Sequence, residues 1–530
     1  MASQKNFAIT PSVSISRSKF RRPSQHKTSF NLGDIVPIYV DADILPGDTV
    51  SMDLATLVRM STPIAPIMDN IFIDYYAFFV PNRLIWFDWK KFMGENTASA
   101  GAVTVEPTYP TEEIGTAGRI TTGCIGDYMG LPHLGSGSSS VKVSSLPGRA
   151  YTCVYSEWFR DQNLINPVVN YDQNAGYHLG VQSGNSITYA SSLFKAAKES
   201  DYFTRALPFA QKGSPVSLPL GSVADVKLKN VVSSTIADGT SLDLKISEGG
   251  GIAPGELGGI RNYNGATVNG RLYADLSNAT AATINQLRFA FQYQKFLEKD
   301  ALYGTRYWEI LKGHFGITAP DASLQRPELL GHFRQHINVD QVLQTSESGT
   351  TALGTPGANS VSGKSDHLIS KSFVEHGVLL ILAVARHEQT YGQGLNRMWS
   401  RVHRTDFYFP VFANLGAQEI KNKELYAGTS SDELPFGYQE AWAEYRYKPS
   451  ICTALMNPAV SSSMSFWNLS NNFGSLPTLS QSFIEQDRTN LARALVTGST
   501  GPDFIADFYF DAVYVRPMPM YSIPGLIDHH

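Results

Sequence analysis

The side chains that enzymes use for catalysis or metal binding occur in this chain, but not in the spacings that such chemistry needs. His387-Glu-Gln-Thr-Tyr391 begins like a zinc-protease helix, yet Tyr391 stands where the second histidine is required. His332 and His336 are four residues apart and could share a helix face, but no glutamate follows His332. We interpret His332 and His336 as structural or exposed histidines, with a metal site as the weaker alternative.

Motifs for cofactors and nucleophiles are equally incomplete. Gly392-Gln-Gly394 lacks the third glycine and the preceding strand of a dinucleotide-binding loop. Neither a phosphate-binding G-x-x-x-x-G-K-[ST] loop nor a G-x-S-x-G nucleophile turn occurs. Carboxylate pairs such as Glu485 and Asp487 fit a solvated helix face equally well. We therefore expect a protein that is not an enzyme and that uses no cofactor or metal.

The basic N-terminal segment is the one candidate site with a physical argument. Residues 1–30 contain cations and no acidic residue, with Ser, Thr, Gln and Pro between them. Neutralising phosphates releases counterions, which gives affinity without base reading, and Phe20 or Phe30 could stack on a base. A solvated tail, or an arm on a neighbouring subunit's acidic surface, is the alternative. The candidate nucleic-acid-binding residues are Arg17, Lys19, Arg21, Arg22 and Lys27.

Composition indicates a packed globular protein. The 530 residues are 42% hydrophobic, 11% aromatic and 17% charged, with a net charge of −4. Three widely spaced cysteines without a C-x-x-C pair fit reduced thiols in a cytosolic environment. Residues 1–16 lack the apolar segment of a signal peptide. The apolar run Val378–Ala385 is too short to span a bilayer and fits a doubly covered strand.

Strand signals are spread through the whole chain. Asn70–Val80 is apolar or aromatic on both faces, so we expect both faces to be covered. Other predicted strands are Asp34–Val40, Asp48–Leu54, Ser372–Arg386, Phe407–Phe412, Gln439–Tyr447 and Asp503–Val515. Predicted helices are Tyr151–Ile165, Asn285–Ile310 with a break at Gly304, and Ser482–Leu495. The pattern favours a β-sandwich or barrel with helices in long connections.

Two stretches stand apart from this pattern. Residues 213–283 contain only two aromatic side chains, and alternating apolar residues flank Asp238-Gly239, which is typical of a hairpin turn. We interpret this stretch as a small β-rich unit on the surface. Residues 346–365 lack apolar periodicity and are predicted to form a mobile loop.

Several segments resemble, in order along the chain, the major capsid proteins of the microviruses, which are small single-stranded DNA bacteriophages, and specifically the gokushovirus branch. Arg205 and Phe209 depart mildly from the family wording, and residues 97–147, 213–283 and 346–366 are variable. The segments that carry the resemblance are Ser16–Phe20 with Phe30–Asp34, Asp69–Trp89, Glu157–Asn163, Asp201–Phe209, Arg306–Glu309 with Asp321–Glu328, and Arg516–Gly525.

The resemblance implies an all-β-dominated fold, an eight-stranded antiparallel jelly roll with long, partly helical insertions between strands. It divides the chain into a basic N-terminal arm at residues 1–30, a capsid core at 31–212 and 284–530, and a surface insertion at 213–283. Insertions of this kind form protrusions at the threefold axes of the shell. Host attachment is the role expected for the insertion, with a purely structural cap as the alternative.

The resemblance also implies a function. Copies of the chain would assemble into a T=1 icosahedral shell around a circular single-stranded DNA genome, with the basic arm facing inward. Expected partners are further copies, the genome, a minor spike or DNA-pilot protein, a scaffolding protein and a host surface receptor, without membrane insertion. The expected location is the virion, assembled in the cytoplasm of a bacterial host. A β-rich carbohydrate-active enzyme or glycan-binding protein is the alternative, but it would not explain the acid-free basic segment or the ordered signatures.

Overall fold

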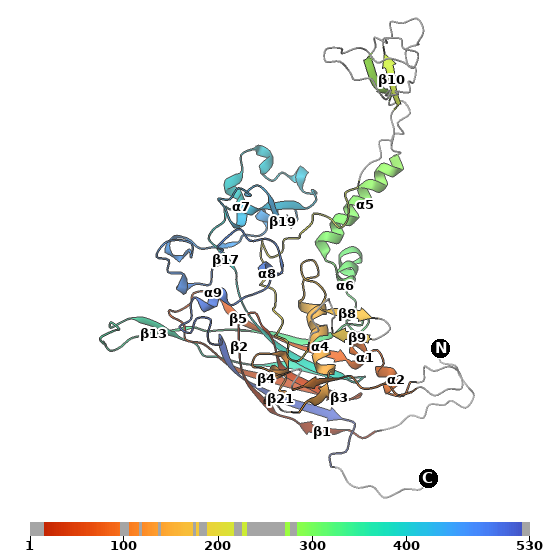
Figure 1. Ribbon diagram of the computed structural model, residues 1–530, viewed down its shortest axis with the longest axis vertical. Helices are drawn as coiled ribbons and strands as arrows, with labels where there is room; N and C mark the ends of the chain where they lie inside the picture. Colours follow the sequence, from red (N-terminus) through yellow and green to blue (C-terminus); the bar gives the residue numbers. More distant parts are fainter. Residues whose placement is uncertain are drawn as a thin grey trace, which may run out of the picture. The chain divides into compact units, whose positions relative to one another are not determined.

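Two antiparallel sheets form the centre of the computed structural model (Figure 1). The structure describes residues 15–95, 105–115, 119–135, 139–172, 176–179, 188–216, 225–229, 271–275 and 284–521. The first sheet runs in the order β1–β21–β4–β15, and β2 also pairs with β21. Its strands are β1 (Ser18–Arg21), β2 (Ser24–Phe30), β4 (Thr49–Met60), β15 (Ser362–Ser372) and β21 (Phe504–Arg516).

The second sheet runs in the order β12–β5–β16–β3 and is covered on both faces. Nearly every residue of β5 and β16 is buried, because both strands are apolar on both faces. This confirms the two covered faces that the sequence predicts for Asn70–Val80. The strands of this sheet are β3 (Ile35–Ile44), β5 (Ile71–Pro81), β12 (Glu328–His336) and β16 (Gly377–His387).

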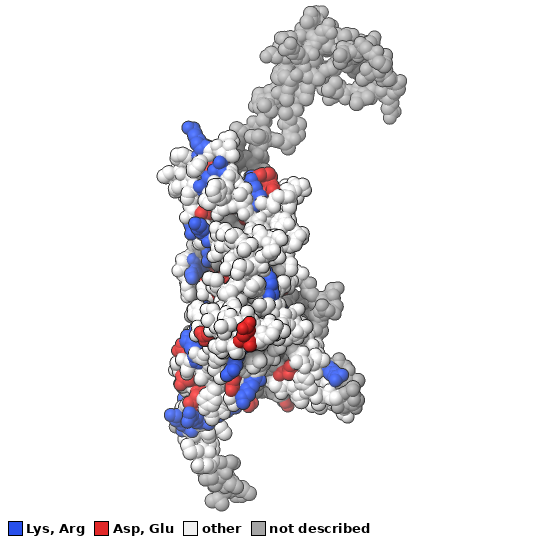
Figure 2. Space-filling view, turned by 90° about the vertical axis from the view of Figure 1, so that its left-hand side faces the viewer, with Lys and Arg blue, Asp and Glu red and all other residues white. Residues whose placement is uncertain are grey.

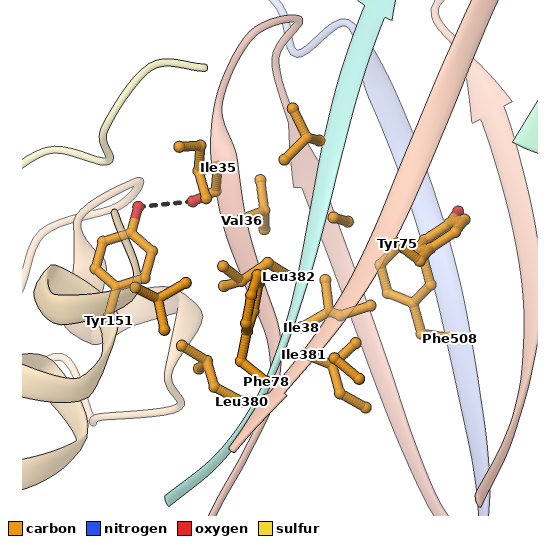
Figure 3. Packing of buried hydrophobic residues seen from close by; sticks show 14 of the residues in the cluster. Ile35, Val36, Ile38, Tyr75, Phe78, Tyr151, Leu380, Ile381, Leu382 and Phe508 are labelled. Atoms are coloured by element: carbon orange, nitrogen blue, oxygen red, sulfur yellow. Dashed lines mark hydrogen bonds between the residues drawn. The ribbon is translucent and has the colours of Figure 1, made fainter. Parts of the chain in front are cut away.

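The first sheet covers one face of the second and exposes its own outer face. Side chains of β4 alternate between buried apolar residues such as Met52 and Leu54 and exposed residues such as Asp53. In the core between the sheets, the rings of Tyr75 and Phe508 lie 5.9 Å apart (Figure 3). The first sheet therefore has one buried face and one solvent-exposed face.

Helix α4 (Leu146–Val154) adds a third layer on the far face of the second sheet. The hydroxyl of its buried Tyr151 donates a hydrogen bond of 2.7 Å to the carbonyl oxygen of Ile35 (Figure 3). The predicted helix Tyr151–Ile165 is thus shifted: α4 begins earlier and continues as a π-helix, Tyr155–Phe159. None of the described helices is both long and apolar enough to cross a bilayer.

Residues 211–301 form a compact unit separate from the rest of the chain. Within it, β10 (Asp225–Lys229) pairs antiparallel with β11 (Arg271–Asp275). Strand β10 contains Val226 and Leu228, which belong to the alternating apolar residues before Asp238-Gly239, whereas the predicted turn at Asp238-Gly239 lies outside the described residues. Helix α5 (Ile284–Tyr303) ends at the predicted break, where Gly304 has a φ of +109°, and α6 (Tyr307–Ile310) follows.

Several predicted elements between β12 and β21 are wrong. Phe407–Phe412 is not a strand: Pro410, which cannot donate to a ladder, begins a short 3-10 helix there. Gln439–Tyr447 contains only the end of β19 (Pro435–Gln439), followed by another 3-10 turn. The predicted loop 346–365 includes β14 (Pro356–Asn359), which pairs with β13 (Asp340–Leu343), and the start of β15.

Short elements complete the connections. The predicted helix Ser482–Leu495 is two short helices, α8 and α9. The remaining α-helices and strands of the described residues are α1 (Asn82–Ile85), α2 (Trp89–Phe92), β6 (Thr111–Ile114), α3 (Ile125–Tyr128), β7 (Val141–Ser144), β8 (Val169–Asp172), β9 (Gly176–Leu179), β17 (Thr390–Tyr391), β18 (Gln418–Lys421), α7 (Asn422–Leu425), β20 (Ser450–Ile451), α8 (Gln481–Ile484) and α9 (Thr489–Ala492).

Candidate nucleic-acid interface

The basic N-terminal segment lies in the first sheet from Ser18 onward. Strands β1 and β2 both pair antiparallel with β21, so that Lys19 stands opposite Val515 and Lys27 opposite Asp507. Phe30 is buried, and its ring stacks on that of Phe504 with centroids 5.4 Å apart. Residues 18–30 are therefore part of the sheet rather than a free arm.

Because successive side chains of a strand point to opposite faces of the sheet, the five candidate cations differ in exposure and in the face on which they lie. Lys19, Arg21 and Lys27 are exposed and lie on the outer face of the first sheet, while Arg22 is only partly exposed. Arg17 is exposed just before β1. The structure thus brings three of the five side chains to one face, which is the face turned away from the core.

Two of the five cations are held by acidic side chains from distant strands. Arg21 donates to both carboxylate oxygens of Asp511, at 2.8 and 2.7 Å, which lowers the pKa of the Asp511 carboxyl and raises the pKa of Arg21. Arg22 donates to Asp41 at 2.9 Å, and its guanidinium lies 4.7 Å from the ring centroid of Tyr514. The segment that is free of acids in sequence is therefore not free of acids in space.

The remaining cations are available to an anionic ligand. Arg17, Lys19 and Lys27 form no ion pair with another residue of the described ranges. Exposed Tyr509 and Ile505 lie on the same outer face, on the strand next to Lys27. Lys27 thus offers a point charge near an aromatic ring on the same face, a combination that suits single-stranded nucleic acid, while Lys19 lies further along β21, opposite Val515. On the face seen in Figure 2, cationic and anionic side chains are mixed.

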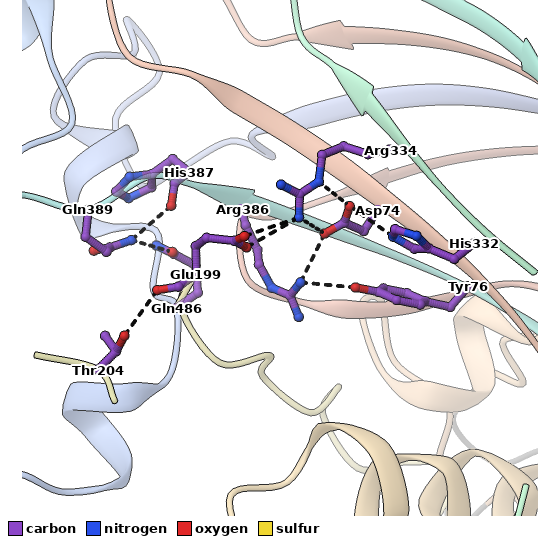
Figure 4. A network of polar contacts seen from close by, with 10 residues as sticks. All are labelled: Asp74, Tyr76, Glu199, Thr204, His332, Arg334, Arg386, His387, Gln389 and Gln486. Atoms are coloured by element: carbon purple, nitrogen blue, oxygen red, sulfur yellow. Dashed lines mark hydrogen bonds and ion pairs between the residues drawn. The ribbon is translucent and has the colours of Figure 1, made fainter. Parts of the chain in front are cut away.

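A second polar cluster is buried in the second sheet (Figure 4). The carboxylate of Asp74, which is 0% exposed, accepts from Arg334 at 2.7 and 3.0 Å and from Arg386 at 3.1 Å. His332 lies 3.3 Å from the same carboxylate, on strand β12 rather than on the helix that its spacing from His336 suggested. This is a structural ion cluster that joins three neighbouring strands.

His387 lies at the end of β16 in a fully buried environment. Its Nδ1 is 2.6 Å from the carbonyl oxygen of Glu388, and burial lowers the pKa of the imidazole to about 4. Among the described residues, no group of three or more His, Cys, Asp or Glu side chains is arranged to hold a metal ion.

Three of the segments that carry the family resemblance meet at one place. The guanidinium of Arg326 lies 4.1 Å from the ring centroid of Trp158 and 5.0 Å from that of Trp308, and it pairs with Asp321 at 2.7 Å. Trp158 also donates to the carbonyl oxygen of Pro327 at 3.0 Å. These aromatic and charged residues fasten α6 and the start of β12 to the π-helix, so their role is packing.

Comparisons with known proteins identify the class. The chain matches the family described as capsid protein (F protein) over residues 8–526. It is 41% identical over 540 residues to capsid protein VP1 of Bdellovibrio phage phiMH2K, covering 98% of both chains. It is 35% identical to capsid protein VP1 of Chlamydia phage 1 and 36% identical to that of Spiroplasma virus 4, in each case over 98% of this chain and 97% of the relative.

The chain is therefore a structural protein of a virus particle. It belongs to the F capsid protein family, and among its members it is a major capsid protein of the microvirus type, similar to those of gokushovirus-like phages. Since these relatives are capsid proteins, they agree with the prediction of a protein that is not an enzyme.

Proposed function

We propose that copies of this protein assemble into a small T=1 icosahedral shell that encloses a circular single-stranded DNA genome, and that its two sheets form a jelly roll. The observation that carries the fold is the pairing of the eight main strands. Numbered one to eight along the chain, β2, β3, β4, β5, β12, β15, β16 and β21 pair first with eighth, second with seventh, third with sixth and fourth with fifth.

This pairing is what results when one long antiparallel hairpin is rolled up. The pairs divide between two sheets, because β21 also pairs with β4 and β16 also pairs with β5. When two sheets are connected in this manner, the loops between strands lie at both ends of the barrel, and these loops can carry long insertions. Electron microscopy of the expressed protein tests the assembly: closed particles of one small diameter are expected, whereas a soluble monomer or dimer at high concentration would contradict the proposal.

Genome binding is assigned to the outer face of the first sheet and to the residues before it. The support is the exposure of Arg17, Lys19 and Lys27 without ion pairs among the described residues, and the position of Lys27 next to the strand that carries exposed Tyr509. Arg21 and Arg22 contribute less, because Asp511 and Asp41 already hold them. The five residues named from the sequence therefore divide into three that bind phosphate and two that stabilise the sheet.

Salt-dependent binding of an oligonucleotide separates the two groups. Replacing Arg17, Lys19 and Lys27 by Gln is expected to reduce the slope of log affinity against log salt by about 2, at roughly 0.7 per lost phosphate contact on single strands. The matched control replaces Arg21 and Arg22 by Gln and is expected to leave the slope nearly unchanged. Equal effects of the two variants would show that the division is wrong.

Host attachment is assigned to the insertion at 213–283. The support is its separation: residues 211–301 form their own compact unit, and Lys229 pairs directly with Arg271 across the strands β10 and β11. Replacing 230–270 by a short Gly-Ser turn therefore preserves β10 and β11. We expect particles that assemble normally but adsorb poorly to host cells. Failed assembly would indicate a structural cap, and normal adsorption would place the receptor site elsewhere.

The other expected partners are a spike or DNA-pilot protein and a scaffolding protein. Membership of the capsid protein family is the only support for these partners and for assembly in the bacterial cytoplasm.

A further inference from the structure

The connection between β17 and β18 exposes a group of large apolar side chains near α7 (Figure 1). Residues 395–415 of this connection contain three short 3-10 helices. The side chains of the group are 43–80% exposed, although large apolar residues are ordinarily buried. No role described above uses them. We call them the aromatic surface: Trp399, Val402, Phe407, Tyr408 and Phe409 from residues 395–415, and Tyr445 from the 3-10 helix Ala443–Tyr445.

Contacts between these side chains join several of them into one continuous area. The ring of Tyr445 lies 6.1 Å from that of Tyr408, and its hydroxyl accepts from the backbone N–H of Tyr408 at 3.3 Å. The guanidinium of Arg401 lies 4.6 Å from the ring centroid of Tyr445 and 5.3 Å from that of Phe407, so it links the two rings. Single exposed apolar residues need no explanation, but a continuous group of them indicates an interaction site.

The aromatic surface is held in one conformation by the residues beneath it. The ring of buried Trp442 lies 5.7 Å from that of Tyr408, and its indole N–H donates to the carbonyl oxygen of Phe412 at 3.0 Å. The carboxylate of Asp406 accepts from the backbone N–H of Val402 at 2.8 Å. Side chains that are already fixed lose little conformational entropy when a partner binds. The surface is therefore prepared for a contact.

The composition of residues 395–415 is that of a protein–protein interface. These 21 residues include five aromatic residues, three arginines and one methionine, and they contain no lysine and no glutamate. Interface cores are enriched in the first group and depleted of the second. Two of the arginines, Arg397 and Arg401, lie within 4.0 Å of Glu444, so few free cations remain for a nucleic acid. The chemistry therefore favours a protein partner.

The exposed apolar area is large enough to form most of one side of an interface. From the area that a buried aromatic side chain covers, the five aromatic residues of the surface expose about 400–600 Å² together. Val402, which is 80% exposed, adds to this area. The largest apolar patch on a typical monomer is about 300–600 Å², and a standard interface buries about 800 Å² on each partner. The aromatic surface thus reaches the size expected of a stable contact.

The partner must be available to every copy of the chain, because every copy exposes the aromatic surface. Another copy of this chain meets that condition in any particle, since one partner is then present for each surface. The chain also belongs to a family of capsid proteins. We propose that the aromatic surface is a contact between neighbouring copies of this protein in its shell. The proposal rests on the shell assembly proposed above and adds the surface that carries the contact.

Replacing Trp399 by Glu tests the contact. Trp399 is 72% exposed, so its loss should leave the subunit folded, but in an interface the new carboxylate would be buried without a partner. Because Trp and Tyr side chains carry much of the binding energy of interfaces, the protein concentration at which particles form should rise at least about 10-fold. Light scattering over a dilution series measures that concentration, and Trp399→Phe should lose less. Val402→Glu carries the test if Trp399→Glu does not fold.

Photo-crosslinking identifies what covers the surface. Particles formed by the expressed protein alone offer no partner except further copies, so the variant Trp399→p-benzoylphenylalanine can react only with this chain. Covalent dimers are expected from particles but not from dissociated subunits, and the cross-linked peptide should belong to another copy. Particles that yield no dimers would overturn the proposal. Cross-links that appear only after a spike or scaffolding protein is added would assign the surface to that partner instead.

Val374→Glu is the matched control. Val374 is 86% exposed between β15 and β16, but its neighbour Phe373 is buried and its neighbour Glu375 pairs with Arg83 at 2.6 Å, so it lacks a comparable group around it. This variant should assemble as the unmodified protein does, and the melting temperature of each variant shows that it is folded. If the unmodified protein forms no particles, shell assembly itself is contradicted and the proposal falls with it. If it forms particles and folded Trp399→Glu assembles equally well, or if Val374→Glu loses as much, only the assignment of the contact is wrong.

Discussion

Two arginine–carboxylate pairs of similar geometry should differ sharply in what they contribute to stability. Asp74 and Asp511 both accept two hydrogen bonds from one guanidinium, at 2.7–3.0 Å for Arg334 and 2.7–2.8 Å for Arg21. Asp74 is completely buried, whereas Asp511 lies on the outer face of the first sheet. Substitution of each aspartate by Asn keeps the size and removes the charge.

The loss of unfolding free energy expected for Asp74→Asn follows from the burial of the arginines that pair with Asp74. Removing one partner from a buried ion pair costs about 3–5 kcal/mol, because a desolvated charge is left behind. Arg386 would lose its carboxylate while its side chain is only 12% exposed. Arg334 is 34% exposed and keeps Glu199 at 3.4 Å. We therefore expect the lower end of the range, about 3 kcal/mol, for Asp74→Asn. For Asp511→Asn we expect a change too small for a denaturant unfolding curve to resolve, since surface pairs are screened by water.

Denaturant unfolding of the purified, unassembled subunit, followed by tryptophan fluorescence, measures the difference. Circular dichroism before unfolding verifies that each variant retains its sheets. Similar losses for Asp74→Asn and Asp511→Asn, or no loss for Asp74→Asn, would refute the reasoning that burial rather than geometry sets the contribution of these pairs.

Two further predictions concern the second sheet. Replacing Phe79, which is 3% exposed and 4.6 Å from the ring of Phe373, by Ala should cost about 3–5 kcal/mol in the same unfolding assay; a loss near zero would contradict the burial of Phe79 in the core. Because burial lowers the pKa of His387 to about 4 from its ordinary 6.5, the unfolded chain binds the proton first, so stability should fall as pH decreases from 6.5 to 4. His387→Gln should lose this part of the pH dependence, and an unchanged profile would exclude His387 as its source.

The most apolar strands were predictable from sequence because burial on both faces leaves a continuous signal. Asn70–Val80 and the run around Val378–Ala385 became β5 and β16 for that reason. The alternation of Asp503–Val515 likewise became β21. Strands β2 and β12 were missed, because Ser24–Phe30 and Glu328–His336 are mostly polar and become strands through pairing with β21 and β5.

The candidate site was less predictable than the fold. The five cations were visible in sequence, but Asp511 is 490 residues from Arg21, and only the pairing of β1 with β21 brings the two together. The alternation of Asp507, Tyr509 and Asp511 in the predicted strand did show a polar face. It did not show which strand would lie beside it. The run of aromatic residues in Phe407–Phe412 predicted a strand that the structure does not contain. Its apolar side chains are largely exposed, and a 3-10 helix begins at Pro410.

The pairing of β1 and β2 with β21 has a consequence for the order of events during synthesis. While a ribosome is still making the chain, β4 lacks the neighbour that β21 will provide, and β1 and β2 lack the strand with which they pair in the described residues. The first sheet therefore cannot close until β21 has left the ribosome, and a nascent chain carries an open, aggregation-prone edge until then. Only a chain whose β21 has emerged can present the completed outer face, so translation itself delays the moment at which a subunit becomes competent to join others.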